Sequence, residues 1–379
     1  MATMIDYLSW RGDLPFTRDP FNEVDNLILS ELAYTKMEQI VAGPDSADLL
    51  PLREVCAAYE RLGYKGVGNA NNAYPLLKAA AATRRFGGIR VGSFVNRIDR
   101  EKEIQFSAVT FFPEDGTAFI AFRGTDNSIV GWREDFNLSY LTETPGQFEA
   151  VNYLEQTASR YSLPIRVGGH SKGGNLAVYA AAFCQPEIKA RILAVYSNDG
   201  PGFHPAVTDA PAYREGLDKV TLLIPEASVI GILLSNEAKR RIVRSSAVGT
   251  GQHNPYTWEV TGNRFLEADS RTAMSLFMDE TSHRWIRELD EEQLKRLGDA
   301  VFGAMDASGA ATLTEMNENK WASYNAIIKA VLQMDPTMQK ELWRSARSLA
   351  ATGGSVLWQE AKKRAGKAGR QKTTRSDTD

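Results

Sequence analysis

One serine in this chain lies between glycines at a spacing that suits a nucleophile. Gly169, Ser171 and Gly173 form the pattern G-x-S-x-G, which follows the apolar run 163–167 and precedes the alanine-rich stretch 175–184. The pattern predicts a strand that turns sharply into a helix and holds the serine hydroxyl clear of the backbone. Glycine avoids the clash that a Cβ would cause in such a turn. The N–H groups that begin the helix would favour negative charge beside the serine.

A serine nucleophile needs a base, and the chain offers four histidines. His253 lies in a glycine-rich loop before a strand-like segment, and such a loop can present a side chain over the edge of a sheet. We therefore expect His253 to be the base, with His204 and His283 as alternatives. His170 is adjacent to the serine and is expected to point away from it.

Two carboxylates could orient this base. Asp199 follows the predicted strand 191–197 in a turn, at the carboxyl end where catalytic groups gather in open α/β sheets. Ordinary turn chemistry would also explain an Asp-Gly-Pro sequence there. Glu226 ends the next predicted strand and is the alternative acid. We favour Asp199.

Negative charge on the substrate oxygen would need two N–H donors, the oxyanion hole. One is expected from the backbone of Lys172, directly after the nucleophile. The predicted strand 117–122 would deliver Thr125 to the same sheet edge, where its N–H and its hydroxyl could both donate. A hairpin turn with an exposed Arg123 is the alternative interpretation of this segment.

These segments together resemble a known family. Phe122-Arg123-Gly124-Thr125, followed by Gly131-Trp132 and Asp135-Phe136, is similar to the F-R-G-[ST]…W…D-[FL] segment of class 3 (fungal-type triacylglycerol) lipases. The run 169–174 resembles their G-H-S-x-G-G elbow, and the run 253–258 resembles their late histidine segment. The resemblance implies an oxyanion role for Thr125. The runs 197–203 and 252–255 look more specifically like a bacterial lipase-like subgroup of α/β-hydrolases.

Two positions depart from the lipase pattern. Lys172 stands where the lipases usually have leucine, which suggests a less apolar site floor or a charge that faces the substrate. The lipases carry their acid in a D-x-V-P segment, and its counterpart here, Ser228 to Gly231, has no carboxylate. Either Asp199 or Glu226 substitutes, or the triad is incomplete.

The order of predicted elements indicates an α/β fold. Strands are expected at 89–94, 103–112 and 117–122, and strands and helices then alternate to residue 224, which predicts a mostly parallel sheet covered by helices. This is the α/β-hydrolase fold that the resemblance implies. After Ala268 the periodicity is helical. We therefore expect a hydrolase domain at 1–267 with N-terminal helices that only pack on it, a helical cap or partner-binding region at 268–361, and a disordered basic tail at 362–379.

Composition narrows the function. The chain of 379 residues has 43% hydrophobic and 24% charged residues and a net charge of −3, so nothing points to nucleic acid. The first residues do not resemble a secretory signal and no run is long and apolar enough for a bilayer, so a cytoplasmic protein is expected. The prediction is a serine hydrolase for carboxylic esters, with a small ester or lipid-like acyl substrate, a Ser171–His253–Asp199 triad, and no metal or organic cofactor. The alternatives are a thioesterase or peptidase with the same triad, and a catalytically weak scaffold that binds a protein through 268–361.

Overall fold

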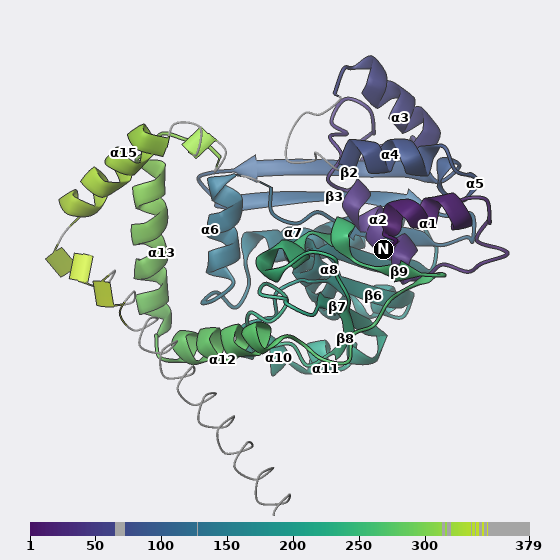
Figure 1. The fold of residues 1–379 in the computed structure, drawn as a ribbon. Coiled ribbons are helices and arrows are strands. Elements are labelled where there is room, and N and C mark those ends of the chain that lie inside the picture. The colour runs from purple at the N-terminus through teal and green to yellow at the C-terminus, as the bar shows by residue number, and fades with distance from the viewer. Residues whose placement is uncertain are drawn as a thin grey trace, which may run out of the picture.

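The computed structural model describes residues 1–64, 73–126, 128–312 and 320–334, together with 315–316, 336–337, 339–340, 343–344 and 347. One sheet of eight strands runs through it in the order β1 to β8 (Figure 1). The first four strands pair antiparallel, and the pairs from β4 to β8 are parallel. The strands are β1 (Leu50–Pro51), β2 (Arg90–Asp99), β3 (Ile104–Phe112), β4 (Ala118–Phe122), β5 (Ile165–His170), β6 (Ile192–Asn198), β7 (Val220–Pro225) and β8 (Lys239–Val243).

Helices cover both faces of this sheet. Side chains alternate along β4, where Phe119 and Ala121 join one buried cluster while Ile120 and Phe122 join another. Helices α7 (Pro145–Arg160) and α8 (Lys172–Phe183) pack on the second of these faces. The expected α/β class with a mostly parallel sheet is therefore confirmed.

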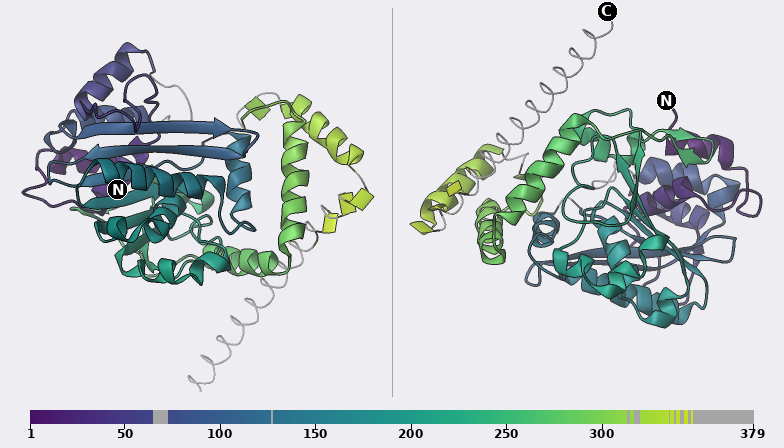
Figure 2. Two further views of the ribbon diagram at one scale, coloured as in Figure 1. Left: turned by 180° about the vertical axis from the view of Figure 1, so that it is seen from behind. Right: turned by 90° about the horizontal axis from the view of Figure 1, so that it is seen from below.

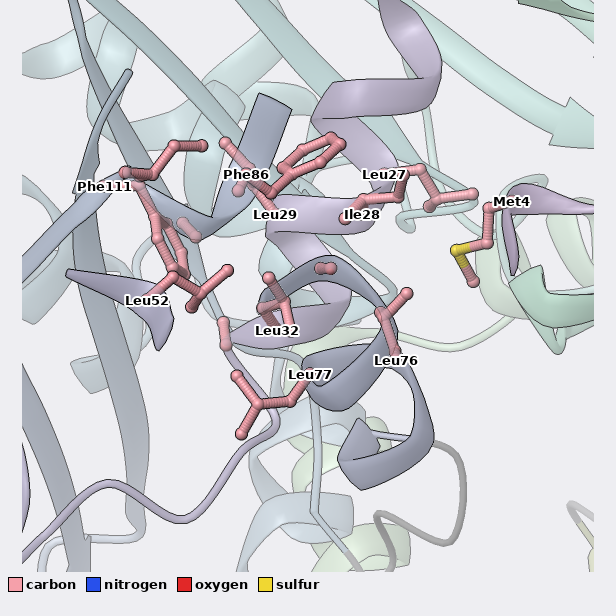
Figure 3. Close-up of a cluster of buried hydrophobic side chains, with 14 of the residues drawn as sticks. Met4, Leu27, Ile28, Leu29, Leu32, Leu52, Leu76, Leu77, Phe86 and Phe111 are labelled. Carbon is pink, nitrogen blue, oxygen red and sulfur yellow. The ribbon is translucent and has the colours of Figure 1, made fainter. Parts of the chain in front are cut away.

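The first face is covered by the N-terminal helices, which form a compact layer around α2 (Figure 3). Every residue of α2 from Val24 to Leu32 is buried, because the helix lies between the sheet and its neighbours. Asn22 caps the helix by accepting from the N–H groups of Val24 and Asp25. The helices of this layer are α1 (Met4–Arg11), α2 (Glu23–Leu32), α3 (Leu52–Arg61), α4 (Ala73–Ala81) and α5 (Arg84–Gly87).

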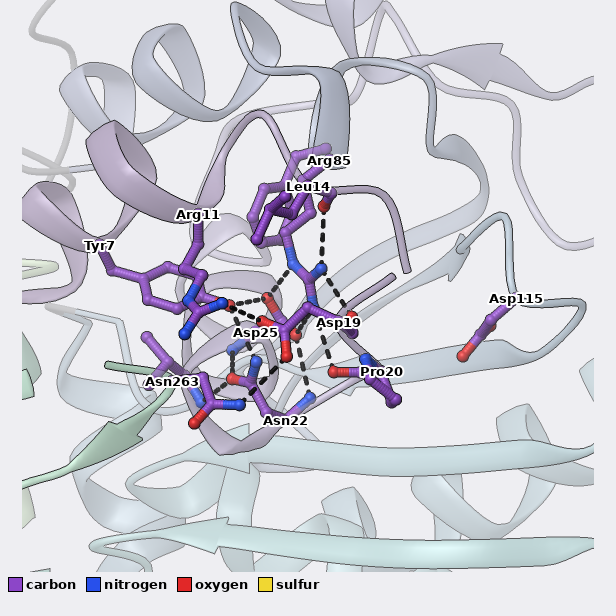
Figure 4. Close-up of polar contacts among 12 residues, drawn as sticks. Tyr7, Arg11, Leu14, Asp19, Pro20, Asn22, Asp25, Arg85, Asp115 and Asn263 are labelled. Carbon is purple, nitrogen blue, oxygen red and sulfur yellow. Dashed lines mark hydrogen bonds and ion pairs between the residues drawn. The ribbon is translucent and has the colours of Figure 1, made fainter. Parts of the chain in front are cut away.

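A buried ion pair fixes α2 within the layer (Figure 4). Arg85 donates from Nε to Asp25 Oδ1 at 2.8 Å and from Nη2 to Oδ2 at 2.5 Å, and both side chains are fully buried. Its Nη1 donates to the carbonyls of Leu14 and Asp19, and Tyr7 donates to Asp25 as well. Because both charges are paired and hydrogen-bonded, the network sets one position for α2 relative to the loop 14–20.

Short elements connect the strands of the sheet. Helix α6 follows β4 and contacts β3. Its bounds and those of the other connecting elements are α6 (Ile129–Asn137), α9 (Pro186–Lys189), α10 (Pro205–Thr208), α11 (Pro211–Arg214), the 3-10 helices Leu217–Lys219, Gly249–His253 and Pro255–Thr257, and the hairpin strands β9 (Val260–Thr261) and β10 (Arg264–Phe265).

The described elements after β10 are helices: α12 (Ala273–Arg287), α13 (Glu291–Asp306) and α15 (Lys320–Gln333) (Figure 2). Helix α13 packs against α6, where Arg133 forms a 2.8 Å ion pair with Asp299 and the ring of Phe136 lies against Phe302. Whether 268–361 is a separate domain stays a prediction, and the tail 362–379 lies outside the described residues. No helix in the described part of the chain has the length and apolar character needed to cross a membrane.

Candidate active site

The serine after β5 occupies a strained turn between that strand and α8. Ser171 has φ +58° and ψ −133°, a conformation that side-chain-bearing residues rarely adopt. A Cβ on Gly169 would overlap the backbone of Gly173, and a Cβ on Gly173 would overlap the carbonyl of Phe122. Both positions therefore need glycine, as the sequence pattern predicts.

A histidine and an aspartate lie in line with this serine. His253, at the end of the 3-10 helix Gly249–His253, has Nε2 at 3.1 Å from Ser171 Oγ and Nδ1 at 2.7 Å from Asp199 Oδ2. An ionised carboxylate only accepts, so the proton of the neutral ring belongs on Nδ1. Nε2 then has a free lone pair beside the serine hydroxyl, which is the arrangement that a general base requires.

The acid of this arrangement is buried and firmly held. Asp199 follows β6 with φ +50° and is fully buried. Its Oδ1 accepts from the hydroxyl of Ser228 at 2.5 Å and from the N–H of Gly231 at 3.1 Å. Ser228 stands at the position where the resemblance to the lipases would place their acid. In this structure its hydroxyl donates to the carboxylate of Asp199 instead.

The alternative residues lie elsewhere. The side chain of Glu226 makes no hydrogen bond or ion pair with any residue that the structure describes, and its loop is tied by backbone bonds to Val243 and Thr272. His204 accepts from the N–H of Ala206 at the start of α10, and His283 Nε2 lies 2.9 Å from the carbonyl of Ile232. The structure thus brings Asp199, and not Glu226, to His253.

The loop after β4 passes directly beside the nucleophile. A Cβ on Gly124 would lie 3.1 Å from the Cβ of Ser171, which places the next residue, Thr125, at the serine. The hydroxyl of Thr125 donates to Asp135 Oδ2 at 2.5 Å, so it is already engaged. The backbone N–H groups of Thr125 and Lys172 donate to no other described residue. Both N–H groups are therefore free to bind an oxyanion. The hydroxyl of Thr125, which was expected to donate as well, already donates to Asp135. Arg123 is buried and bonded to Asn96, so the exposed hairpin arginine is not found.

The side chain of Lys172 is buried away from solvent. Its Nζ donates to Glu134 Oε2 at 2.7 Å and to the backbone and side-chain oxygens of Gln105 at 2.8 and 2.7 Å. Glu134 also accepts from the N–H of Gly146 at 2.7 Å. The expectation of a free charge facing the substrate is therefore wrong, because this ammonium joins the elbow to α6 and β3.

Asp135 carries the perturbed carboxyl of the site. Burial raises its pKa to about 6, and the charge of Lys172 and the hydrogen bond from Thr125 only partly oppose that effect. Its Oδ1 is buried and has no hydrogen-bond partner among the described residues. The ionised form of Asp135 is therefore costly at neutral pH.

A cavity of about 840 Å³ opens at the serine and extends between α6 and the C-terminal helices. Ser171, His253 and Thr125 form a polar part of its lining. Its walls are mainly apolar and come from the loop after β7 and from α6, α12 and α13: Trp132, Phe136, Leu138, Ile230, Leu233, Leu234, Met278, Trp285, Ile286, Leu294 and Phe302. The helices after residue 268 therefore shape the same cavity as the nucleophile.

Sequence reasoning missed several residues of this site. Glu31 and Tyr34, from the N-terminal layer, line the cavity beside His170, although those helices were expected only to pack on the sheet. Asp135 was noted only as part of a resemblance. Helix α2 also carries Glu23, Asp25, Asn26 and Ser30, so no local signal in the sequence marks Glu31 as a residue of the site.

The mixed sheet, the strand–serine–helix turn and the late histidine loop together define a lipase-like α/β-hydrolase fold. The chain belongs to the Mbeg1-like family, whose model matches residues 80–303.

Two solved lipase structures are similar to part of the chain. The structure of M37 lipase is 19% identical, with a TM-score of 0.33, and the alignment covers 48% of this chain and 70% of that one. The structure of the Rhizomucor miehei lipase propeptide complex is 14% identical, with a TM-score of 0.34, and the alignment covers 53% and 72%. No curated protein matches the chain significantly.

Proposed function

We propose that this protein is a serine hydrolase that cleaves carboxylic esters through an acyl-enzyme intermediate. The observation that carries the proposal is the His253 ring, which bridges Ser171 Oγ at 3.1 Å and Asp199 Oδ2 at 2.7 Å. Ser171 Oγ attacks the ester carbonyl as His253 Nε2 takes its proton, and the N–H groups of Lys172 and Thr125 receive the developing oxyanion. His253 then protonates the leaving alcohol. Water enters, and the same base activates it to release the acid.

The lining of the cavity favours an apolar acyl group as the part of the substrate that binds there. Ser171, His253 and Thr125 line one part of it, and large apolar side chains from α6, α12 and α13 line another. Burial of one methylene group contributes about 0.8 kcal/mol, or about a fourfold gain in kcat/KM. A series of p-nitrophenyl esters is therefore expected to gain about fourfold per methylene until the cavity is filled. A flat series would contradict the acyl assignment.

The nucleophile is tested with a fluorophosphonate probe. The full-length protein is expected to be labelled and to hydrolyse p-nitrophenyl esters, and Ser171→Ala is expected to lose both. The loss in kcat should be about 10⁴-fold to 10⁶-fold, as when a triad serine is removed. The matched control is Ser139→Ala, which removes another hydroxyl that lines the cavity. Labelling that persists in Ser171→Ala would overturn the assignment.

Thioesters and amides are alternative substrates for the same triad, since they differ only in the leaving group. Matched ester, thioester and anilide substrates with one acyl chain decide among them. The ester is expected to have the highest kcat/KM.

One observation favours a protein partner in addition to catalysis. Ile328 and Leu332 of α15 lie one turn apart and are 56% and 70% exposed. The double substitution Ile328→Lys and Leu332→Lys is expected to abolish a complex formed by this helix and to leave ester hydrolysis intact. A complex that survives the substitution would place the partner elsewhere.

A further inference from the structure

Helix α2 and the residues just after it contact the segments that carry the reactive groups. Asn26 donates to the side chain of Asn198, one residue before Asp199. Glu31 lies at His170, one residue before Ser171, and Tyr34 lies at Gly124, one residue before Thr125. Residues 23–34 precede the family match at 80–303, so these contacts come from a part of the chain that the family model does not cover.

The contacts of His170 define its protonation. Its Nε2 lies 2.9 Å from the backbone carbonyl oxygen of His253, which can only accept, so Nε2 carries a proton. Its Nδ1 lies 3.1 Å from Glu31 Oε1, and both side chains are buried. This distance is within ion-pair range and favours a proton on Nδ1 as well, although Glu31 Oε1 makes no hydrogen bond with a described residue. Burial alone would lower the pKa of His170, but the Glu31 carboxylate, together with Asp199 and the carbonyl of His253, outweighs burial and the pKa is raised.

This cation lies against the ring of the general base. The ring centroids of His170 and His253 are 4.7 Å apart with an interplanar angle of 34°. A positive charge at that distance disfavours a second positive charge on His253, whereas Asp199 at its Nδ1 favours one. His170 therefore opposes early protonation of the base while its hydrogen bond holds the backbone that carries the base.

We propose that Glu31 and His170 are positioning residues for the general base: Glu31 keeps a proton on His170, and the His170 imidazolium anchors the His253 carbonyl and keeps the His253 ring neutral in the resting enzyme. This inference rests on the proposed function, in which His253 is the base. The groups that face His170 are Glu31 from α2, His253 from its loop, Asp199 from the end of β6 and the ring of Tyr34, which lies 6.2 Å away.

Tyr34 offers a matched comparison because it ties the same segments without a charge. Its hydroxyl accepts from the N–H of Gly124 at 3.1 Å and donates to the carbonyl of His170 at 3.4 Å. A Cβ on Gly124 would overlap that hydroxyl, which shows how closely the two segments meet. Tyr34→Phe should disturb the oxyanion loop and leave the charge balance at His253 unchanged.

The charge is tested first without reference to activity. Imidazole ¹⁵N NMR on the full-length protein, with four histidines to assign, reports the protonation of each ring. In the wild type the pKa of His170 is expected to lie above the ordinary value of a histidine, because Glu31 is its neighbour. In Glu31→Gln its titration is expected to move down by at least about one pH unit, since a buried opposite charge shifts a pKa by that much or more. An unchanged titration of His170 would overturn the inference even in a protein with no activity.

Kinetics then test positioning. Glu31→Gln and His170→Gln are expected to lower kcat about 10-fold to 100-fold with little change in KM, the cost of a slightly misplaced catalytic group. The acidic limb of kcat/KM should move to higher pH in both, because His253 loses the neighbouring cation. His170→Gln retains an amide donor for the His253 carbonyl, and Tyr34→Phe should lower kcat without moving the limb.

Three results separate the possibilities. The inference is supported if the acidic limb of the kcat/KM pH profile moves in Glu31→Gln and His170→Gln and stays in place in Tyr34→Phe. If kcat falls only in proportion to a lower Tm and the acidic limb of the kcat/KM pH profile does not move, the inference is overturned and Glu31 and His170 have only a structural role. A wild-type protein that neither reacts with fluorophosphonate nor hydrolyses esters would instead refute the proposed function, and the NMR titration would still report on His170.

Discussion

Asp199→Asn is the sharpest test of the triad, because the contacts of this side chain decide how an asparagine would sit. The N–H of Gly231 and the hydroxyl of Ser228 both approach Oδ1, and the N–H requires an acceptor there. The amide oxygen of the variant would therefore occupy that position, and its NH₂ group would face His253 Nδ1. Nδ1 would have to accept, so the ring proton would move to Nε2. That tautomer cannot take the proton of Ser171.

The expected loss in kcat is about 10⁴-fold, or about 5.5 kcal/mol, which is the size of effect that the wrong histidine tautomer causes in a serine protease triad. The assay is steady-state hydrolysis of a p-nitrophenyl ester at pH 7.5, with near-ultraviolet circular dichroism to verify the fold. Glu226→Gln is the matched control. Its side chain makes no hydrogen bond or ion pair with the described residues, so it should keep kcat within about twofold. Activity within tenfold of the wild type in Asp199→Asn, or a large loss in Glu226→Gln, would refute the assignment of the acid.

Three further predictions concern stability. A carboxyl whose pKa is raised on folding contributes stability below its unfolded pKa and loses it as the pH rises through the folded value, here about 6 for Asp135. Asp135→Asn should therefore raise the free energy of unfolding at pH 8 relative to pH 4 by up to about 3 kcal/mol in urea titrations, and an equal effect at both pH values would contradict the burial of this charge. Asp25→Ala leaves Arg85 buried without its partner and should cost about 3–5 kcal/mol. The control is Asp13→Ala, at an exposed residue whose side chain makes no hydrogen bond or ion pair with the described residues. Lys172→Leu introduces the usual lipase residue but leaves the Glu134 carboxylate unpaired, so it should lower the free energy of unfolding by a similar amount. The double variant with Glu134→Gln should recover most of that loss. Losses that are fully additive in the double variant would argue against the pairing of Lys172 with Glu134.

The reactive core of the site could be predicted because its sequence signals are local. The glycines around Ser171 are required by a single turn, and the loop of His253 is recognisable by its own glycines. Asp199 and Glu226 each follow a predicted strand, so this placement does not separate them. Only the structure shows that Asp199, held by Ser228 and Gly231, is the one that contacts His253.

Other elements could not be predicted because their reasons are long-range. The basic strand β8 (Lys239–Val243) lacks the apolar pattern of a buried strand, yet it adds to the sheet edge while Arg241 pairs with Glu23 and Glu267. The sequence also suggested that Lys172 faces the substrate. Its partner Glu134 lies 38 residues earlier in the chain, and no local sequence pattern predicts that the two side chains pair.

The N-terminal layer contacts the segments that carry the candidate site residues. The sheet edge supplies Ser171 and Asp199 on separate strand ends, and His253 lies on a loop whose carbonyl oxygens contact His170 and Trp258. Loops of that kind move unless packed groups fix them, and a displacement of about 1 Å at a catalytic group can cost about 10²-fold in rate. Helix α2 supplies that fixation because it is buried along its whole length and anchored by Arg85. Residues 80–303 alone would lack α2 and much of the apolar cover of one sheet face, so the residues that support the candidate site extend beyond the segment that the family model matches.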